Sequence, residues 1–465
     1  MGPVPELEER ATACASRLRE ADSVLLASHI DADGLTSAAV AAQALSRADI
    51  PFEVVFENQL DADAIAEIAE RGFETVLFTD FGSGQLDAIT EYAGEFVPVI
   101  CDHHQPTEAE TDFHLNPLLF GLDGAAELSG AGAAYVLARA LGGEENRDLA
   151  ALAVVGAVGD MQASSGELVG ANRGIVTEGV EAGVLRETTD LALYGKQTRP
   201  LPKLLEYAND VHIPGISGSE RGAIGFLTDL DIELEGTDGW RRWADLTPDE
   251  RQTVASALLK RAVSRGVPAA RIENLVGTTY TLTEETAGTE LRDASEFSTL
   301  LNATARYDRA DVGLAVCLGD REDALDEARG LLTNHRRNLA TGLDWVKREG
   351  VTQAERVQWF DAGERIRETI VGIVAGMAMG TDEIRSDRPV IAFAAKSDTE
   401  SKVSARGTHK LVRAGLDLSS VMGEAARALG GEGGGHDVAA GATIPKGRED
   451  DFIERADAIV TEQLG

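Results

Sequence analysis

The feature that most constrains the fold is an alternation of short apolar runs and longer amphipathic segments near the start of the chain. The runs with the length and residue types of buried strands are 24–28, 52–56, 75–79 and 97–101. Helix-length amphipathic segments separate them, at 35–47, 61–71 and 84–93. This alternation predicts an α/β fold with a parallel, doubly wound sheet. Such sheets bind their ligands at the carboxyl ends of the strands.

Polar side chains follow three of these runs at the point where each expected strand ends. The first run continues into His29, Asp31 and Asp33, which alternate along the chain and can therefore point to the same side. The third run is followed by Asp80, and the fourth by Asp102-His103-His104. Because the carboxyl ends of parallel strands share one edge of a sheet, we expect these groups to converge.

A further carboxylate, Asp160, ends the apolar segment 152–159, where an unpaired charge would be costly. Crowded carboxylates repel one another unless cations neutralise them, and two divalent cations would do so. The mixture of oxygen and imidazole ligands favours manganese, admits magnesium, and fits zinc less well because no cysteine is near. Two such ions can hold both oxygens of an in-line phosphoryl displacement, so the pattern predicts hydrolysis of a phosphate ester or diester.

A plainer explanation exists for each position alone, because an aspartate after a strand usually caps a helix or lies in a loop. Capping does not account for adjacent histidines after one strand together with a His-x-Asp-x-Asp run after another. The joint pattern therefore favours a catalytic centre.

The motifs and their order resemble those of the DHH phosphoesterases, which carry four successive motifs like 28–34, Asp80, 102–104 and Asp160. The resemblance implies two ligand sets that share Asp80. The expected ligands of one metal are His29, Asp31 and Asp80. Those of the other are Asp33, Asp80, His103 and Asp160. The resemblance also implies that His104 assists the phosphate or leaving group and that Asp102 orients the histidines.

A glycine run, Gly433-Gly434-Gly435-His436, lies near the C-terminus, with Ser404 and Arg406 upstream. Glycines let a backbone approach a phosphate closely, and successive N–H groups can cradle it. An arginine and a histidine add charge-assisted contacts. The set resembles the DHH-associated C-terminal domain, which implies that these six residues bind substrate. The motif disfavours the manganese pyrophosphatase branch of the superfamily.

The expected organisation has three parts, with the active site in an interdomain cleft. They are a DHH domain at 1–185, a partly helical connecting or insertion region at 186–290, and a smaller α/β C-terminal domain at 291–465. The last part begins with a second α/β pattern, in which the apolar run 312–317 stands where a strand is expected. A long helix pair, a further strand at 389–394 and a glycine-rich turn at 430–435 follow.

The net charge of −36, from 79 acidic and 43 basic residues, predicts a surface adapted to concentrated salt and hence a halophilic host. This charge disfavours a nucleic-acid partner only weakly, because counterion release contributes little in concentrated salt. No apolar stretch is long enough to span a membrane, and the N-terminus lacks the features of a secretory signal. We therefore expect a cytoplasmic protein with no membrane partner.

Length, layout and the segments 292–303 and 307–313 are similar to those of archaeal RecJ-like nucleases. The resemblance implies an exonuclease for single-stranded DNA or RNA ends, with 5′-to-3′ polarity favoured, in replication or repair. One alternative is a phosphodiesterase for short oligonucleotides or 3′-phosphoadenosine 5′-phosphate. The other is a replisome scaffold that binds the GINS complex, a partnership that is also compatible with catalysis.

Overall fold

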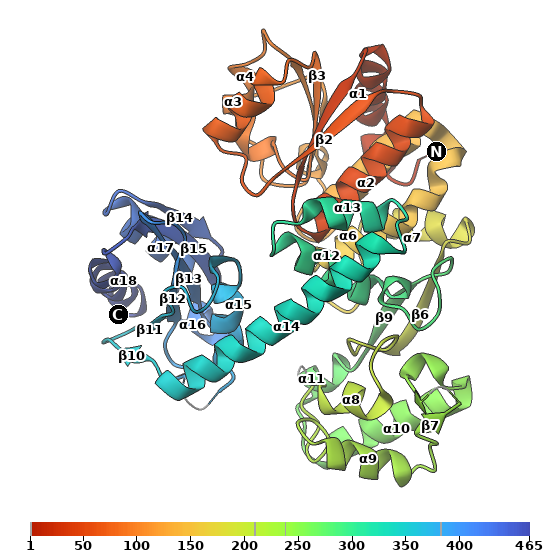
Figure 1. Ribbon diagram of the computed structural model, residues 1–465, viewed down its shortest axis with the longest axis vertical. Helices are drawn as coiled ribbons and strands as arrows, with labels where there is room; N and C mark the ends of the chain where they lie inside the picture. The colour runs from red at the N-terminus through yellow and green to blue at the C-terminus, as the bar shows by residue number, and fades with distance from the viewer. Residues whose placement is uncertain (1, 209–210, 238, 382–383) are drawn as a thin grey trace. The chain divides into compact units, whose positions relative to one another are not determined.

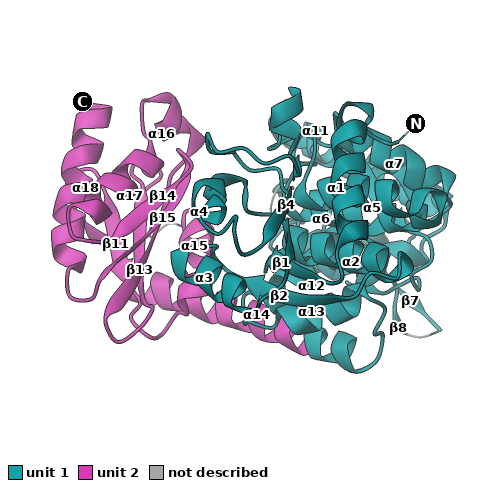
Figure 2. Cartoon of the chain, turned by 90° about the horizontal axis from the view of Figure 1, so that it is seen from above, with its two compact units in different colours: residues 1–329 teal, residues 330–465 magenta. Residues whose placement is uncertain are grey.

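The computed structural model describes residues 2–208, 211–237, 239–381 and 384–465. The chain divides into two units, residues 1–329 and 330–465 (Figure 2). Each unit has its own main β-sheet, with five strands in the first unit and six in the second. None of the helices in the described ranges combines the length and apolar content that crossing a membrane requires.

The sheet of the first unit is parallel throughout, in the order β2-β1-β3-β4-β5. Its strands are β1 (Val24–His29), β2 (Phe52–Glu57), β3 (Thr75–Thr79), β4 (Val97–Cys101) and β5 (His114–Leu115). The central strand β3 is buried at every position, as expected of a strand that is covered on both faces. The expected doubly wound α/β fold is confirmed.

Helices cover both faces of this sheet (Figure 1). The helices of this part are α1 (Glu8–Glu20), α2 (Ala32–Arg47), α3 (Ala62–Glu70), α4 (Leu86–Thr90), α5 (Gly130–Gly142), α6 (Ala150–Gly159) and α7 (Asn172–Glu181). The apolar faces of α3 and α4 share one core with the side chains of Val76, Phe78 and Ile100. Helices α2 and α5 contact each other and the sheet, so they hold the segments that follow the strands in place.

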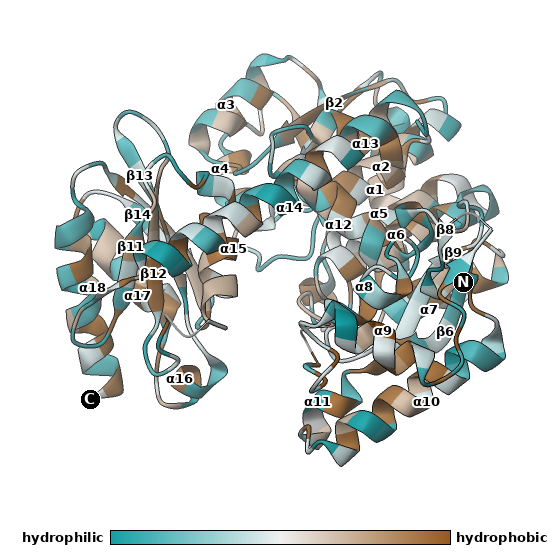
Figure 3. Cartoon of the chain, turned by 60° about the horizontal axis from the view of Figure 1, so that its bottom comes forward, coloured by the Kyte–Doolittle hydropathy of each residue, from teal (hydrophilic) through white to brown (hydrophobic). Residues whose placement is uncertain are grey.

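A subdomain with its own core projects from the antiparallel pair β6 (Leu185–Leu191) and β9 (Val276–Leu282). Its elements are α8 (Leu201–Glu206), α9 (Glu220–Thr228), the hairpin β7 (Glu235–Gly236) and β8 (Gly239–Trp240), α10 (Pro248–Ser264) and α11 (Ala269–Glu273). Trp243 is fully buried in that core. Helix α10 alternates hydrophobic and hydrophilic residues along its length, so one side faces the core and the other faces solvent (Figure 3).

The next two helices include a correction to the sequence-based expectation. They are α12 (Ala294–Ala305) and α13 (Ala310–Cys317). The run 312–317, expected to be a strand, lies in α13. Its buried residues, Val312, Gly313, Val316 and Cys317, recur with the spacing of one face of a helix. A short apolar run does not reveal its period, so a buried helix segment resembles a buried strand in sequence.

The sheet of the second unit is mixed, in the order β10-β11-β12-β13-β15-β14. Its strands are β10 (Thr352–Gln353), β11 (Gln358–Asp361), β12 (Val390–Ala395), β13 (Glu400–Arg406), β14 (Glu432–Gly435) and β15 (Ala439–Pro445). The glycine run therefore lies in an edge strand, whereas a turn was expected at 430–435. Glycine has no side chain to mark a strand, so its backbone pairing with β15 was not visible in the sequence.

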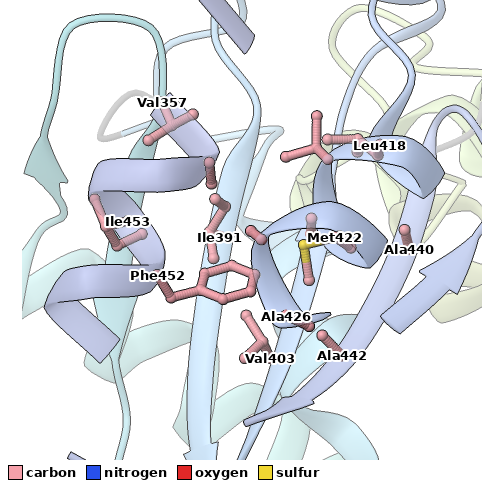
Figure 4. Packing of buried hydrophobic residues seen from close by; sticks show 14 of the residues in the cluster. Val357, Ile391, Val403, Leu418, Met422, Ala426, Ala440, Ala442, Phe452 and Ile453 are labelled. Carbon is pink, nitrogen blue, oxygen red and sulfur yellow. The ribbon is translucent and has the colours of Figure 1, made fainter. Parts of the chain in front are cut away.

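The helices of this region are α14 (Asp323–Glu349), α15 (Glu368–Ala378), α16 (His409–Arg413), α17 (Leu418–Arg427) and α18 (Glu449–Leu464). The expected long helix pair is one helix of 27 residues, α14, followed after two short strands by the shorter α15. One face of the sheet packs against α17 and α18 in a core that contains Met422 and Phe452 (Figure 4).

Candidate metal centre

Polar residues lie at the carboxyl ends of three neighbouring strands of the parallel sheet. β1 ends at His29, Asp80 follows β3, and Asp102 follows β4. Because β1 pairs with β3 and β3 with β4, all in parallel, these residues meet at the carboxyl edge. His29 Nδ1 lies 3.4 Å from Asp80 Oδ2, and His103 Nε2 lies 3.3 Å from Asp80 Oδ1.

The first motif reaches this edge in a way that the sequence pattern did not predict. β1 ends at His29, and α2 begins at Ala32, so the motif does not continue as a strand. Asp31 caps α2 by accepting a hydrogen bond from Gly34 N, and its Oδ1 lies 3.3 Å from His29 Nδ1. Asp33 lies in the first turn of the helix instead. The predicted alternation along a strand is therefore not what brings these side chains together, although all three of them do converge.

Asp33 is held by the start of another helix. Its two carboxylate oxygens accept hydrogen bonds from Gly130 N (2.7 Å) and Ala131 N (3.0 Å), in the first turn of α5. The positive end of the α5 dipole favours a carboxylate there. Asp33 Oδ2 also lies 3.7 Å from His103 Nε2, so α2 and α5 together fix this group beside the histidine.

The His103 ring is oriented by a backbone carbonyl. Its Nδ1 lies 2.7 Å from Gly124 O, which can only accept, so Nδ1 carries the proton of this hydrogen bond. The Nε2 atom then faces Asp80 and Asp33 and can offer a lone pair to a cation. Asp160, at the C-cap of α6, lies with its Oδ2 3.7 Å from His103 Nδ1.

Asp80 lies at the centre of the group and is 2% exposed. Its two carboxylate oxygens face different histidines, Oδ2 toward His29 and Oδ1 toward His103. Oδ1 is buried and, within the described part of the chain, has no neighbour aligned for a hydrogen bond. The residue also has a positive φ of 60°, which few side chains other than Asn and Asp adopt. A strained, buried carboxylate with an unused oxygen fits a ligand that bridges two cations.

Close backbone approach makes room for this arrangement. A Cβ atom on Gly130 would lie 2.5 Å from Asp80 Oδ1, and one on Gly156 would lie 2.4 Å from Asp33 Oδ1. Neither carboxylate could keep its position beside a larger residue.

The pKa shifts in the cluster favour the binding of positively charged ions. Burial, with the charges of Asp80 and Asp160, raises the pKa of Asp33 well above its usual range. Burial also raises the pKa of Asp160 to about 6. Burial lowers the pKa of His29, but the hydrogen bonds and charges of Asp31 and Asp80 outweigh it and raise that pKa to about 11. Asp33 and Asp160 therefore resist ionisation beside Asp80, and divalent cations would relieve this repulsion.

Potential ligand atoms form three sets in the described residues, and within each set they lie within 4.8 Å of one another. The largest set, Asp80, Asp102, His103 and His104, overlaps the site from which the other two are built. Of these two, one is His29, Asp31 and Asp80, and the other is Asp33, His103 and Asp160. Oxygen and imidazole donors of this kind suit divalent cations such as manganese and magnesium. The roles of the individual residues as ligands stay predictions.

Asp102 and His104 form a separate pair beside the cluster. The Asp102 carboxylate is fully buried, and its Oδ1 accepts hydrogen bonds from His104 Nδ1 (2.8 Å) and His103 N (2.7 Å). The His104 side chain is 57% exposed. The hydrogen bond from His104 to Asp102 raises the pKa of the histidine. This ring is therefore placed to carry a proton at its exposed Nε2.

Several supporting residues were not predicted. Ser83 N donates to Asp102 Oδ2 (2.9 Å), and Asn116 Nδ2 donates to both Ser83 Oγ and His104 O at 2.8 Å each. Gln162 Nε2 donates to Asp160 Oδ2 at 2.9 Å. Ser83 and Gln162 lie only three and two residues after Asp80 and Asp160, and Asn116 precedes a proline, but no periodic pattern marks them. The only sequence signal was the Asn116-Pro117 turn.

The predicted substrate-binding residues lie in the second unit and share one sheet. Across β15, Ser404 pairs with Gly441, and Gly441 pairs with Gly434, so Ser404 and the middle glycine of the run lie in one row of the sheet. Gly435 has φ of 139° and leads into a turn closed by His436 N donating to Ala439 O. Arg406 ends β13.

Arg406 and Ser404 both lie against α15 where that helix has a glycine. A Cβ atom on Gly372 would stand 2.7 Å from Arg406 Nη2 and 2.9 Å from Ser404 Oγ. The glycine thus leaves room for the guanidinium group to lie on the helix.

Comparison with protein families gives three matches in order along the chain. Residues 23–157 match the DHH family N-terminal domain, residues 193–276 the DHH-CID domain, and residues 356–462 the DHHA1 domain. Uncharacterized protein MJ0831 of Methanocaldococcus jannaschii is 32% identical over 444 residues, which cover 94% of this chain and 93% of that protein. The single-stranded-DNA-specific exonuclease RecJ of Bacillus subtilis is 28% identical over 198 residues, 40% of this chain and 24% of that protein.

Solved structures show the same fold. RecJ of Thermus thermophilus, crystallised with Mn²⁺, superposes with a TM-score of 0.60 and 18% identity over 99% of this chain, which spans only 55% of the Thermus protein. CDC45 of Entamoeba histolytica superposes with a TM-score of 0.67 and 10% identity over 99% of both chains. With DHH, DHH-CID and DHHA1 domains in succession, the chain belongs to the DHH superfamily and is RecJ-like.

Proposed function

We propose that the chain is a metal-dependent exonuclease that hydrolyses phosphodiester bonds at the ends of single-stranded DNA or RNA. The observation that carries the proposal is the buried carboxylate of Asp80, whose two oxygens face two separate sets of His and Asp side chains. The name of the Bacillus relative, a single-stranded-DNA-specific exonuclease, supports this substrate class. We favour 5′-to-3′ polarity and a role in DNA replication or repair.

The residues of the cluster would divide the work between holding cations and moving a proton. Two divalent cations, preferably manganese, would supply the positive charge that activates water and neutralises the phosphate oxygens. Asp80 would set the spacing of the two sites, and the Gly124 carbonyl would keep His103 Nε2 directed inward. His104 would hold a proton at Nε2 for the leaving oxygen, and Asp102 would keep that ring charged and in place.

Substrate binding is proposed for residues of the second unit. Ser404, Arg406 and the run Gly433-Gly434-Gly435-His436 would grip the phosphates of the strand end. Under this proposal, residues 1–185 carry the metal centre, 186–290 form the inserted region, and 291–465 supply the substrate-binding domain. Arg406→Ala and His436→Ala are expected to weaken substrate capture while leaving manganese binding intact.

A second function is favoured by the likeness to the CDC45 fold, namely a replisome scaffold that binds the GINS complex. The complete set of potential ligands in the cluster weighs against a purely structural role. A phosphodiesterase for short oligonucleotides or 3′-phosphoadenosine 5′-phosphate would use the same residues and differs only in substrate length.

Digestion of end-labelled single-stranded DNA and RNA with Mn²⁺ in high salt tests these functions together. Stepwise shortening of long strands, lost in Asp80→Asn, is the expected result, and the labelled end that disappears first gives the polarity. Cleavage confined to dinucleotides would reject the exonuclease in favour of the short-substrate enzyme. If the manganese-loaded protein cleaves no substrate, the scaffold function is the one that remains.

A further inference from the structure

The charge of the chain is distributed unevenly, and the inserted subdomain is the exception. Residues 193–276 contain 11 basic and 12 acidic residues, whereas the whole chain contains 43 and 79. Almost all of the acidic excess therefore lies elsewhere. Within this subdomain some basic residues stand in groups without acidic neighbours in the sequence.

One such group lies at the end of α10 and in α11. The stretch 251–272 contains five basic residues and no acidic residue. We call four of them the basic patch: Lys260, Arg261, Arg265 and Arg271. Lys260, Arg265 and Arg271 are exposed, and Arg261 is partly buried. The fifth, Arg251, is excluded because its guanidinium donates to the carbonyl oxygens of Trp243 and Ala244.

The basic patch is not paired with carboxylates in the part of the chain that the structure describes. Across the described ranges, none of its four side chains forms an ion pair with a carboxylate, whereas Lys203, Arg241 and Arg242 of the same subdomain all do. Arg261 Nε is buried without a hydrogen-bond partner in those ranges. Favourable interaction with the helix dipole accounts for one or two basic residues in a last turn. It does not account for like charges at Arg261 and Arg265, whose i,i+4 spacing costs about 0.2–0.5 kcal/mol.

One exposed aromatic side chain, that of Tyr207, is linked to the basic patch through the turn at 215–218. Arg261 Nη2 would be 3.1 Å from a Cβ atom on Gly215, and the same turn is tied to α8 because Gly218 N donates to Glu206 O. The next residue, Tyr207, is 50% exposed. Its ring lies under the guanidinium of Arg199, 5.1 Å from the ring centroid, and Lys203 Nζ lies 5.8 Å from the same centroid. Two cationic side chains thus lie against the exposed tyrosine ring.

We propose that the basic patch and Tyr207 form an accessory binding surface for single-stranded nucleic acid, separate from the metal centre. The patch would contact phosphates, and the exposed tyrosine ring would stack on a base. An acidic polypeptide would pair with the same basic residues, but it has no base to stack on the ring of Tyr207. The proposal rests on the proposed nuclease function and assigns this surface to the part of the strand that the catalytic residues do not hold.

The test measures binding of a labelled oligothymidylate of about 30 nucleotides, longer than a single-strand site of about 4–16 nucleotides. Anisotropy titrations in EDTA over a range of salt would compare the full chain with the triple variant Lys260→Gln, Arg265→Gln and Arg271→Gln. A matched control replaces three exposed arginines outside the subdomain, with Arg71→Gln, Arg186→Gln and Arg455→Gln. The triple variant should bind about tenfold more weakly at low salt and show a salt slope lower by about two.

Further outcomes separate this proposal from its alternatives. Tyr207→Leu should weaken binding of the oligonucleotide while leaving binding of poly-glutamate unchanged. Equal loss in the control variant, unchanged affinity in the triple variant, or equal competition by poly-glutamate would overturn the assignment to nucleic acid. Manganese-dependent cleavage of a dinucleotide should be the same in the full chain and the triple variant. If the full chain cleaves no strand, the nuclease proposal fails, whereas normal cleavage with undiminished binding by the triple variant rejects only the accessory surface.

Discussion

The two main sheets present functional groups in opposite ways. At the carboxyl edge of the parallel sheet, the groups are charged side chains such as Asp80 and His103, crowded and buried. In the mixed sheet of the second unit, the candidate surface is largely backbone, because β14 is a run of glycines and Arg406 lies where α15 has no side chain. The first site depends on charges that need a counter-ion, and the second depends on the space that glycines leave beside the backbone. Removing a charge should therefore damage the first, and adding a methyl group should damage the second.

The largest effect should come from Asp80→Asn. Asparagine keeps the shape and also tolerates positive φ, so the fold should survive, while the bridging charge is lost. We expect kcat for manganese-dependent cleavage to fall by at least about 10³-fold, a loss in the range seen when a principal electrostatic group is removed. Thermal unfolding of the metal-free variant serves as the control for folding. Full activity with bound manganese would reject the assignment of Asp80 as a bridge.

A smaller loss is expected from Asp102→Asn, which leaves in place the six residues predicted as metal ligands. The variant should bind manganese normally but lose about 10²-fold in kcat, the size of a general-acid contribution. Because the hydrogen bond to Asp102 raises the pKa of His104, the variant should lower that pKa. The alkaline limb of the pH–rate profile would then move to lower pH, which a merely structural defect would not cause. An unchanged profile would argue against His104 as the proton donor.

In the second sheet the informative pair is Gly372→Ala and Gly376→Ala, one helical turn apart in α15. A Cβ atom at 372 would stand 2.7 Å from Arg406 Nη2, whereas at 376 the nearest atoms of Arg406 are 3.9 Å away. Both variants gain about 1 kcal/mol of helix propensity. Only Gly372→Ala should displace the guanidinium, raising KM about tenfold through loss of one charge-assisted contact, with little change in kcat. Equal KM values would show that Arg406 does not depend on this space.

The same contrast explains how far the sequence could predict the site. Residues that follow parallel strands converge by geometry, so His29, Asp80 and His103 were predicted together before any contact was known. Ser83 and Asn116 were not, because local backbone conformations that leave no periodic pattern bring Ser83 to Asp102 and Asn116 to Ser83.

The fold was predicted best where apolar runs are bounded by polar residues and least where side chains give little information. All four expected strands of the parallel sheet are present. The strand predicted at 312–317 was wrong because so short an apolar run fits the period of a helix as well as that of a strand. Strand β14 was missed because glycine carries no side-chain pattern. Elements such as β14, which depend on backbone pairing and not on a pattern of side chains, are therefore the hardest to predict from the sequence.

The smallest expected effect concerns stability in the absence of metal. Burial raises the pKa of Asp160 from 3.8 to about 6, so the folded state binds this proton more tightly than the unfolded state. Its contribution to stability is therefore present below pH 4 and is lost as the pH rises to about 6, and the raised pKa of Asp33 acts with the same sign. In EDTA, the Tm should fall between pH 4 and pH 7 by a few degrees, at about 2–4 °C per kcal/mol. Asp160→Asn should flatten this slope, and Mn²⁺ should restore the Tm at pH 7 in the unmodified chain because it binds only the folded state. A metal-free Tm that rises steadily over this range would mean that the carboxylates are not crowded in solution, and the contrast between the two sheets would lose its electrostatic basis.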